Sequence, residues 1–343
     1  MKVSVCVPAY ERPSTIVSLI ETINAQTYSG LELVISDDSR SSSVEEVIRS
    51  ECRVTYQYRR NAQRLGFATN LKQALSMASG DMVIILGDDD CFTEPWSVAR
   101  YVEVACEFPS VGFSYGNLTQ IDGAGNVSLI HRYFEDDRLM RAGPDAFRSL
   151  WLRSVQIAGM CFHMPGADVV RFFPEFDSLF PQVIAAGHVL ATRNGFAHGS
   201  LLVGTRVSES QLGYQVAKRA QPMSARASLG GAELLEILTE IRATYPDQIG
   251  SDVRGQVERQ ILRGFVGSLP NMRLYCRRRD ILRMYHGYLV RSRRIWVSLT
   301  AMSVCAAVIV LPRSVIRGCV ALLKPLWLWW TRLHIGVDRR AVP

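Results

Sequence analysis

The eight cysteines of this 343-residue chain show no Cys-x-x-Cys spacing, and Cys6 lies inside an apolar run. The spacing excludes the paired ligands of a typical zinc site, and the pattern is typical of reduced thiols in a cytosolic setting. The sequence also lacks internal repeats and low-complexity segments. No signal peptide precedes the first predicted strand, so we expect the folded domain to remain in the cytoplasm.

Acidic residues are scarce toward the other end of the chain. From Arg254 onward there are 17 basic and 3 acidic residues, whereas residues 1–253 carry 22 basic and 29 acidic ones. A basic tail behind an acidic domain predicts a polyanionic partner, either nucleic acid or an anionic membrane surface.

Charge is absent from residues 295–311, a 17-residue apolar stretch with arginines on both flanks. Trp327, Trp329 and Trp330 follow beside basic residues, as in chains that anchor at a bilayer interface. The tail therefore favours a membrane over nucleic acid. A helix of this length reaches roughly 26 Å, short of the ~30 Å hydrocarbon core. We expect in-plane or re-entrant attachment, with a single span and a soluble core helix as alternatives.

Three consecutive aspartates, Asp88 to Asp90, follow the apolar run 82–86 and Gly87. The run is short and rich in β-branched residues, so it predicts a buried strand. Adjacent carboxylates raise each other's pKa unless a cation compensates their charge. Because Mg²⁺ takes one or two carboxylates together with substrate phosphates, the triplet is a candidate metal site. A solvated acidic turn or a set of helix caps is the structural alternative.

The chain before these aspartates alternates between apolar runs and helical spacings. Runs that predict strands begin at Val3, Leu31, Val54 and Met82, and apolar residues at helical spacing separate them. This alternation predicts a doubly wound α/β fold with a parallel sheet. Ligands of such sheets bind beyond the carboxyl ends of the strands. Three polar clusters, at residues 8–11, 37–38 and 88–90, fall at such ends, so we expect them to converge on one crevice.

Four motifs resemble those of the family-2 glycosyltransferases, which have a GT-A fold. They are Val-Cys-Val-Pro-Ala-Tyr-Glu-Arg at 5–12, Ile-Ser-Asp-Asp-Ser at 35–39, Arg-Asn-Ala-Gln-Arg-Leu-Gly at 60–66, and the segment 78–90 that ends in Gly-Asp-Asp-Asp. The resemblance covers about residues 1 to 100. The last motif is similar to that of the branch that builds bacterial surface polysaccharides, the abequosyltransferase-like enzymes.

The resemblance implies roles for individual residues. Asp38 would accept a hydrogen bond from the nucleobase, and Asp90 would hold Mg²⁺ or Mn²⁺ on the donor diphosphate, with Asp88 as the second metal candidate. Many relatives carry an acidic residue in place of Gly87, which leaves the division of labour among the three aspartates open. The residues expected to bind the nucleotide sugar are Pro8, Tyr10, Glu11, Asp38, Asn61, Gly66, Asp88 and Asp89.

An inverting transfer also needs a base near the acceptor hydroxyl. Asp177 is our first candidate, in an aromatic-rich and proline-flanked segment, and Glu175 and His188 are the alternatives. Asp177 has a structural alternative as the cap of a helix that starts near Phe180. The Gln-x-x-Arg-Trp signature of processive synthases is missing, so we expect one sugar to be moved per acceptor.

The sequence thus predicts a GT-A-like domain over residues 1–220, a helical extension over 221–290 and a membrane-associating tail over 291–343. The function that the resemblance implies is an inverting, metal-dependent transfer of a sugar to a lipid-linked glycan in surface polysaccharide synthesis. The reaction would take place at the cytoplasmic face of the inner membrane. A nucleotidyltransferase and a catalytically inactive membrane-docked scaffold are the alternatives.

Overall fold

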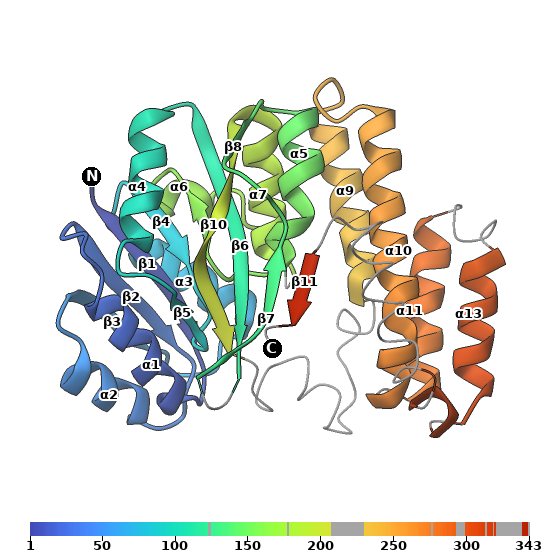
Figure 1. Cartoon of the computed structure of the whole chain (residues 1–343), viewed down its shortest axis with the longest axis horizontal. Helices are drawn as coiled ribbons and strands as arrows, with labels where there is room; N and C mark the ends of the chain where they lie inside the picture. Colours follow the sequence, from blue (N-terminus) through green and yellow to red (C-terminus); the bar gives the residue numbers. More distant parts are fainter. Residues whose placement is uncertain are drawn as a thin grey trace. The chain divides into compact units, whose positions relative to one another are not determined.

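A computed structural model of the chain provides the structure. It describes residues 1–122, 125–176, 178–206, 230–275, 277–292, 299–312, 314–317, 319 and 338–341. The chain divides into two compact units, one formed by Met1–Val207 with Arg340–Pro343 and the other by Ser208–Arg339. The first unit holds the mixed sheet and the second is helical (Figure 1).

The first half of the sheet unit is a parallel α/β arrangement, as the alternation predicts. Its elements are β1 (Val3–Ala9), α1 (Pro13–Asn24), β2 (Leu31–Asp37), α2 (Ser43–Glu51), β3 (Thr55–Arg60), α3 (Phe67–Met77) and β4 (Met82–Ile85). β1 pairs in parallel with β2 and with β4, and β2 pairs in parallel with β3. β1, β2 and β4 are buried along their whole length, which explains why they are rich in apolar residues.

The order of these strands changes direction once. The chain moves outward from β1 to β2 and β3, and then returns across both to place β4 on the other side of β1. Right-handed crossovers therefore put α1 and α2 on one face of the sheet and α3 on the opposite face (Figure 1). The gap between β1 and β4 is thus a topological switch point, where open α/β sheets bind ligands beyond the carboxyl ends of their strands.

The second half of this unit departs from the mostly parallel sheet that we expected. Its elements are β5 (Asp90–Phe92), α4 (Ser97–Glu107), β6 (Val111–Ile121), β7 (Val127–Arg132), β8 (Arg138–Met140), α5 (Pro144–Leu150), η1 (Trp151–Val155), β9 (Met160–Phe162), α6 (Gly166–Val170), α7 (Pro181–Thr192), β10 (Asn194–Arg206) and β11 (Asp338–Ala341). β9 runs antiparallel to β4 and β6, and β5 and β8 run antiparallel to β10. The sheet is therefore mixed.

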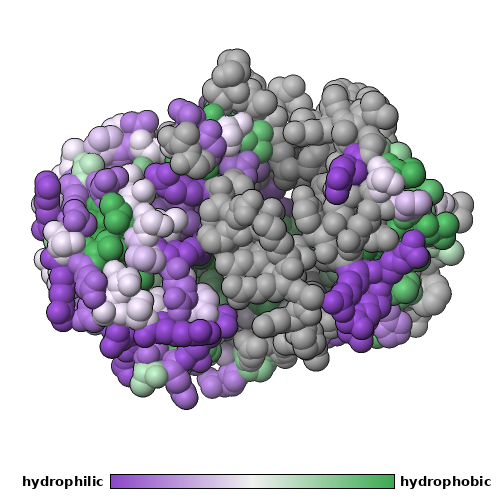
Figure 2. All heavy atoms as spheres, turned by 90° about the horizontal axis from the view of Figure 1, so that it is seen from below, coloured by the Kyte–Doolittle hydropathy of each residue, from purple (hydrophilic) through white to green (hydrophobic). Residues whose placement is uncertain are grey.

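The second unit contains helices. They are the short η2 (Gly230–Ala232), the amphipathic α9 (Glu233–Thr244), α10 (Ser251–Tyr275) and α11 (Arg278–Arg291), and the uncharged α13 (Leu299–Val310). The buried face of α9 consists mainly of leucine and isoleucine. Several apolar side chains of this unit are exposed, among them Val290 and Val310. Figure 2 shows hydrophobic residues beside hydrophilic ones on the visible surface of these helices, at the right of the view.

No described helix combines the length and the apolar character needed to cross a membrane. α13 covers the described part of the apolar stretch and has 12 residues. The first residues of the stretch, 295–298, and the tryptophan cluster at 327–330 lie outside the described residues. The single-span alternative therefore has no support in the part of the chain that the structure describes.

Candidate active site

The turn between β1 and α1 has a backbone conformation that is unusual for its sequence. Glu11 has a φ of 56°, in the left-handed region that favours glycine. Two contacts with the end of β2 hold it there. The Glu11 N–H donates to Ser39 Oγ at 2.7 Å, and Glu11 Oε1 accepts a hydrogen bond from the Arg40 N–H at 3.1 Å. The turn is therefore tied to the neighbouring strand, and Arg12 follows at the N-cap of α1.

Asp38 organises the loop that follows β3. Its Oδ1 accepts hydrogen bonds from Asn61 Nδ2 at 2.9 Å and from the Leu65 N–H at 3.0 Å. Its Oδ2 accepts one from the Gly66 N–H at 2.9 Å. Gly66 has a φ of 81°, and a Cβ atom there would meet no heavy atom within 4 Å, so backbone conformation rather than space requires the glycine. Asp38 thus shapes the loop from within, whatever further bond it makes to a ligand.

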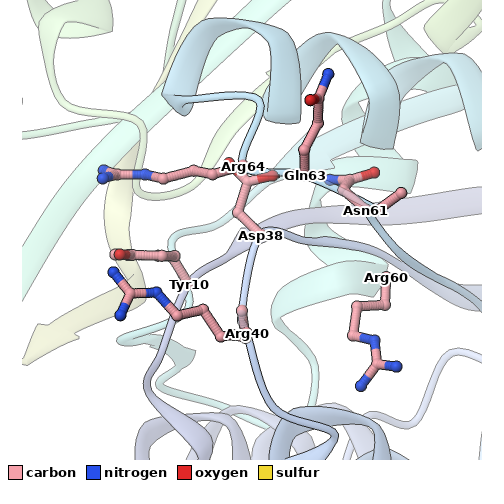
Figure 3. Close-up of a pocket in the computed structure, with 9 residues that line it drawn as sticks. Tyr10, Asp38, Arg40, Arg60, Asn61, Gln63 and Arg64 are labelled. Carbon is pink, nitrogen blue, oxygen red and sulfur yellow. Dashed lines mark hydrogen bonds between the residues drawn. The ribbon is translucent and has the colours of Figure 1, made fainter.

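A pocket of about 330 Å³ opens between these two loops. Its lining consists of Tyr10, Asp38, Ser39, Arg40, Arg60, Asn61, Ala62, Gln63 and Arg64. The Arg64 guanidinium lies over the ring of Tyr10, 4.4 Å from its centroid. In Figure 3 the side chains of Arg40 and Arg64 extend to the same side as Tyr10, whereas Arg60 points away. Arginines outnumber acids in this lining, so the pocket suits an anionic ligand with an aromatic ring.

The acidic triplet lies at the end of β4, and its first two members contact the β1–α1 turn. Asp88 Oδ2 accepts a hydrogen bond from the Tyr10 N–H at 3.0 Å and one from Arg12 Nε at 3.2 Å. Arg12 Nη2 donates to Asp88 Oδ1, and Arg12 Nη1 donates to Asp89 Oδ2 at 2.6 Å. Both oxygens of Asp88 are therefore bound within the protein.

The third member folds back on the strand end. Asp90 Oδ2 accepts a hydrogen bond from the Gly87 N–H at 2.6 Å, and the Thr205 hydroxyl donates to the same carboxylate. A Cβ atom at position 87 would lie 2.9 Å from Asp89 Oδ1 and 3.1 Å from Asp90 Oδ2. The carboxylates of Asp89 and Asp90 thus converge over Gly87. A side chain at position 87 would therefore displace these carboxylates.

Arg12 contacts two of the three carboxylates, and the environment raises the pKa of Asp88 and of Asp90. Burial raises the pKa of Asp88 to about 7, although Arg12 acts in the opposite direction. Burial, followed by repulsion from Asp89, raises the pKa of Asp90 to about 7. All three residues are buried. The end of β4 therefore holds negative charge that the protein itself compensates only in part.

The residues at this strand end fit a hard divalent cation. No three His, Cys, Asp or Glu side chains in the described ranges form a group that could enclose a metal by themselves. Mg²⁺ and similar ions need only one or two carboxylates when substrate phosphates supply further oxygens. Asp89 and Asp90 offer such a pair, since both oxygens of Asp88 already accept protein hydrogen bonds.

The structure does not bring the described base candidates to the triplet or the pocket. The Glu175 side chain is 94% exposed and lies 3.5 Å from Lys72 Nζ. His188 belongs to α7 and stacks on Phe172, with ring centroids 5.3 Å apart, and burial lowers its pKa. Asp177, the first candidate, lies outside the described residues.

Three residues of the site have no role in the sequence-based prediction. Arg12 is part of the first motif, but its contact with the aspartates depends on the left-handed turn at Glu11. Arg64 reaches Tyr10 across two loops. Thr205 lies opposite Asp90 in the β5–β10 ladder, and an antiparallel pairing between such distant segments leaves no local signal in the sequence.

Comparison with known proteins identifies the first part of the chain. Residues 4–157 match the model of the family described as Glycosyl transferase family 2. Abequosyltransferase RfbV of Salmonella typhimurium is 34% identical over 99 residues, which are 27% of this chain and 30% of that protein. A Campylobacter jejuni protein named GalNAc(5)-diNAcBac-PP-undecaprenol beta-1,3-glucosyltransferase is 32% identical over 93 residues, 26% of this chain and 30% of that one. The chain spans about a third of the length of the curated relatives that it matches.

Solved structures extend the likeness of the fold beyond this part. Residues 1–349 of Staphylococcus aureus TarS, in complex with UDP, superpose with a TM-score of 0.53 at 14% identity, covering 90% of both chains. The mannosyltransferase PcManGT from Pyrobaculum calidifontis, in complex with GDP-Man and Mn²⁺, gives 0.52 at 16% identity, covering 97% of this chain and 84% of that one. At these identities the likeness concerns the fold alone.

Proposed function

Since residues 4–157 of this chain match the model of glycosyl transferase family 2, we propose that the protein transfers one sugar from a nucleotide-activated donor to an acceptor. The observation that carries the proposal is the double role of Tyr10. Its ring lines the arginine-rich pocket, while its N–H donates to Asp88 in the acidic triplet. The pocket that would receive the nucleoside therefore lies beside the carboxylates that would hold the diphosphate with its cation, which supports binding of one nucleotide sugar across both.

The residues of the site would divide the work by position. The ring of Tyr10 and the loop held by Asp38 and Asn61 would receive the base and ribose. Asp89 and Asp90 would hold the divalent cation. When bound, this ion neutralises the charge that develops on the departing nucleoside diphosphate. Mn²⁺ accompanies the donor in the PcManGT complex, which supports a metal in this family of folds.

We infer an inverting reaction, which needs a base at the acceptor hydroxyl. Asp177 remains our first candidate for this base, because the Glu175 side chain is exposed and the His188 ring stacks on Phe172. The ionised carboxylate of Asp177 would accept the proton of the acceptor hydroxyl while the hydroxyl oxygen attacks the anomeric carbon of the sugar.

A lipid-linked glycan is the acceptor class that we propose. One relative is named for an undecaprenol-linked substrate and another for abequosyl transfer, which supports a role in surface polysaccharide synthesis. The basic region after residue 253 and the exposed apolar residues Val290 and Val310 are consistent with peripheral docking on an anionic membrane. Co-sedimentation of the full chain with anionic and with neutral vesicles tests the docking. Equal absence from both pellets would contradict it.

A donor panel tests the transfer function. The full-length protein with Mn²⁺ is incubated with UDP-, GDP-, CDP- and dTDP-sugars, and binding is measured by thermal shift while released products are identified. We expect one nucleotide class to stabilise the protein, with slow release of free sugar and nucleoside diphosphate. Asp38→Asn, which weakens the loop of the pocket, should reduce the stabilisation. Release of pyrophosphate from a nucleoside triphosphate would instead indicate a nucleotidyltransferase, and binding without turnover in the presence of acceptor would indicate a scaffold.

A further inference from the structure

Arg12 is aimed at the acidic triplet by a strained turn that the rest of the sheet holds in place. Glu11 is the one non-glycine residue with positive φ in the described part of the chain. Backbone strain of this kind persists only where the surroundings fix it, and it clusters at functional sites. Here Ser39 and Arg40 fix it from the end of β2. The consequence is that the next residue, Arg12, lies across the end of β4 rather than in solvent.

The guanidinium of Arg12 connects two of the three carboxylates. It donates from Nε and Nη2 to Asp88 and from Nη1 to Asp89. The planar fork of arginine suits this double contact, whereas an ammonium group is a single point of charge. Only 22% of the Arg12 side chain is exposed, so water screens these contacts little. Asp88, bound on both oxygens, becomes part of the protein scaffold.

Formal charges explain what this arrangement leaves for a ligand. Among the hydrogen bonds of the described residues, one guanidinium contacts two of the three carboxylates. Taken with its one positive charge, the three ionised carboxylates leave two negative charges, which a divalent cation would balance. However, Oδ2 of Asp89 already accepts a hydrogen bond from Arg12. Oδ2 of Asp90 likewise accepts a hydrogen bond from the Gly87 N–H. A bare cation therefore meets two carboxylates that are each hydrogen-bonded on one oxygen, and it meets the positive charge of Arg12. A diphosphate would add oxygen ligands to the cation and negative charge beside Arg12.

We infer that Arg12 is a positioning residue that acts as a built-in counter-ion. It keeps the empty triplet from binding a divalent cation tightly and so couples cation binding to the arrival of the nucleoside diphosphate. The inference rests on the proposed function, because the cation is the one that assists transfer. Reciprocity requires that the coupling act both ways, so the nucleotide also binds more tightly when the cation is present.

Mn²⁺ binding to the full-length protein tests this role without any turnover. Free Mn²⁺ is measured by its electron paramagnetic resonance signal, with and without UDP or GDP, for the wild type, Arg12→Ala and Arg12→Lys. We expect Arg12→Ala to bind Mn²⁺ about tenfold or more tightly than the wild type in the absence of nucleotide, since a nearby positive charge has been removed. The enhancement of Mn²⁺ affinity by nucleotide should shrink accordingly. Arg12→Lys keeps the charge and should stay close to the wild type.

A second arginine provides a matched control. Arg100 on α4 also bridges two carboxylates, those of Glu103 and Asp137. Arg100→Ala removes the same charge from the same kind of bridge and should leave Mn²⁺ binding unchanged. Circular dichroism and thermal unfolding check the folding of each variant, and Arg12→Gln replaces Arg12→Ala if the latter does not fold.

The possible outcomes separate the two levels of the proposal. If Arg12 has only a structural role, its removal loosens the turn, and the Mn²⁺ affinity of the variants falls or stays the same. This result overturns the counter-ion role. A wild type that binds nucleotide but never Mn²⁺, even with nucleotide present, overturns the metal-dependent transfer itself.

Discussion

Two groups of buried carboxylates lie at opposite ends of the same strands. At the amino ends of β1, β2 and β4, Glu32 accepts hydrogen bonds from Ser4 Oγ at 2.6 Å and from the Ser79 N–H at 2.8 Å, and it pairs with Lys2 Nζ at 2.8 Å. These partners hold the pKa of Glu32 down at about 2, against the effect of burial. At the carboxyl ends, Asp88 and Asp89 of the aspartate triplet share Arg12, and burial raises the pKa of Asp88 to about 7.

Both ends hold buried carboxylates, and they differ in how far neighbouring groups compensate the negative charge. Glu32 is one charge with several donors around it, so its ionised form is stabilised by the fold and needs no ligand. The triplet places three charges where the protein supplies one close cation. Shifted pKa values of this second kind, caused by burial and like charges in a cleft, are typical of functional sites. The sheet thus keeps one acidic group for its own stability and leaves the other for a ligand.

The largest expected effect is the loss of sugar transfer when a carboxylate of the aspartate triplet is neutralised. Asp90→Asn should reduce turnover by about 10² or more, because an amide cannot balance the charge of the cation that assists the leaving group. Binding of nucleoside diphosphate in the presence of Mn²⁺ should weaken as well. Turnover of the donor and calorimetric titration with UDP or GDP measure the two effects.

Asp81→Asn is the control for this change. Asp81 immediately precedes the same strand at its amino end and is exposed, so its variant should turn over like the wild type. If Asp90→Asn is fully active, or if the wild type keeps its rate in excess chelator, the metal assignment is wrong.

The parallel half of the fold could be predicted from the sequence because the buried strands β1, β2 and β4 are rich in apolar residues and alternate with helical spacings. The second half could not, since β5, β8 and β9 have only three residues each. Their direction depends on distant partners, β10 for β5 and β8, and β4 and β6 for β9. The same contrast applies to the site. The three aspartates are adjacent in the sequence, and the apolar run before them predicts their strand. The contact of Arg12 depends on the conformation of Glu11, and the partners of Glu32 come from separate strand ends.

The second largest effect concerns the contribution of Glu32 to the stability of the fold. Glu32→Gln should lower the free energy of unfolding by about 3 kcal/mol at pH 7, which follows from a pKa lowered from 4.5 to about 2. The unfolded chain binds the proton more readily, so this stabilisation is fully present above about pH 4.5 and is lost as the pH falls toward about 2. Denaturant unfolding of the full-length protein at several pH values measures it.

Turnover should separate this effect from catalysis. Glu32→Gln should keep its rate wherever it remains folded, because Glu32 lies away from the ligand-binding end. Glu45→Gln removes a half-buried carboxylate that pairs with the exposed Arg49 on α2 and should cost about 0.5 kcal/mol or less. Equal losses for the two glutamates would show that the buried network contributes nothing special.

The smallest effect has the opposite sign and the opposite dependence on pH. The folded protein raises the pKa of Asp90 from 3.8 to about 7, so the folded state binds a proton more readily than the unfolded chain and loses stability as the pH rises through this interval. Asp90→Asn removes the uncompensated charge, while its amide oxygen can still accept the hydrogen bond from Gly87. Without metal or nucleotide, the variant should therefore be more stable than the wild type at pH 8 and equally stable near pH 4. The same unfolding series measures this difference. If Asp90→Asn and Glu32→Gln both destabilise the protein at pH 8, the two ends of the sheet do not differ in the way that their hydrogen bonds indicate.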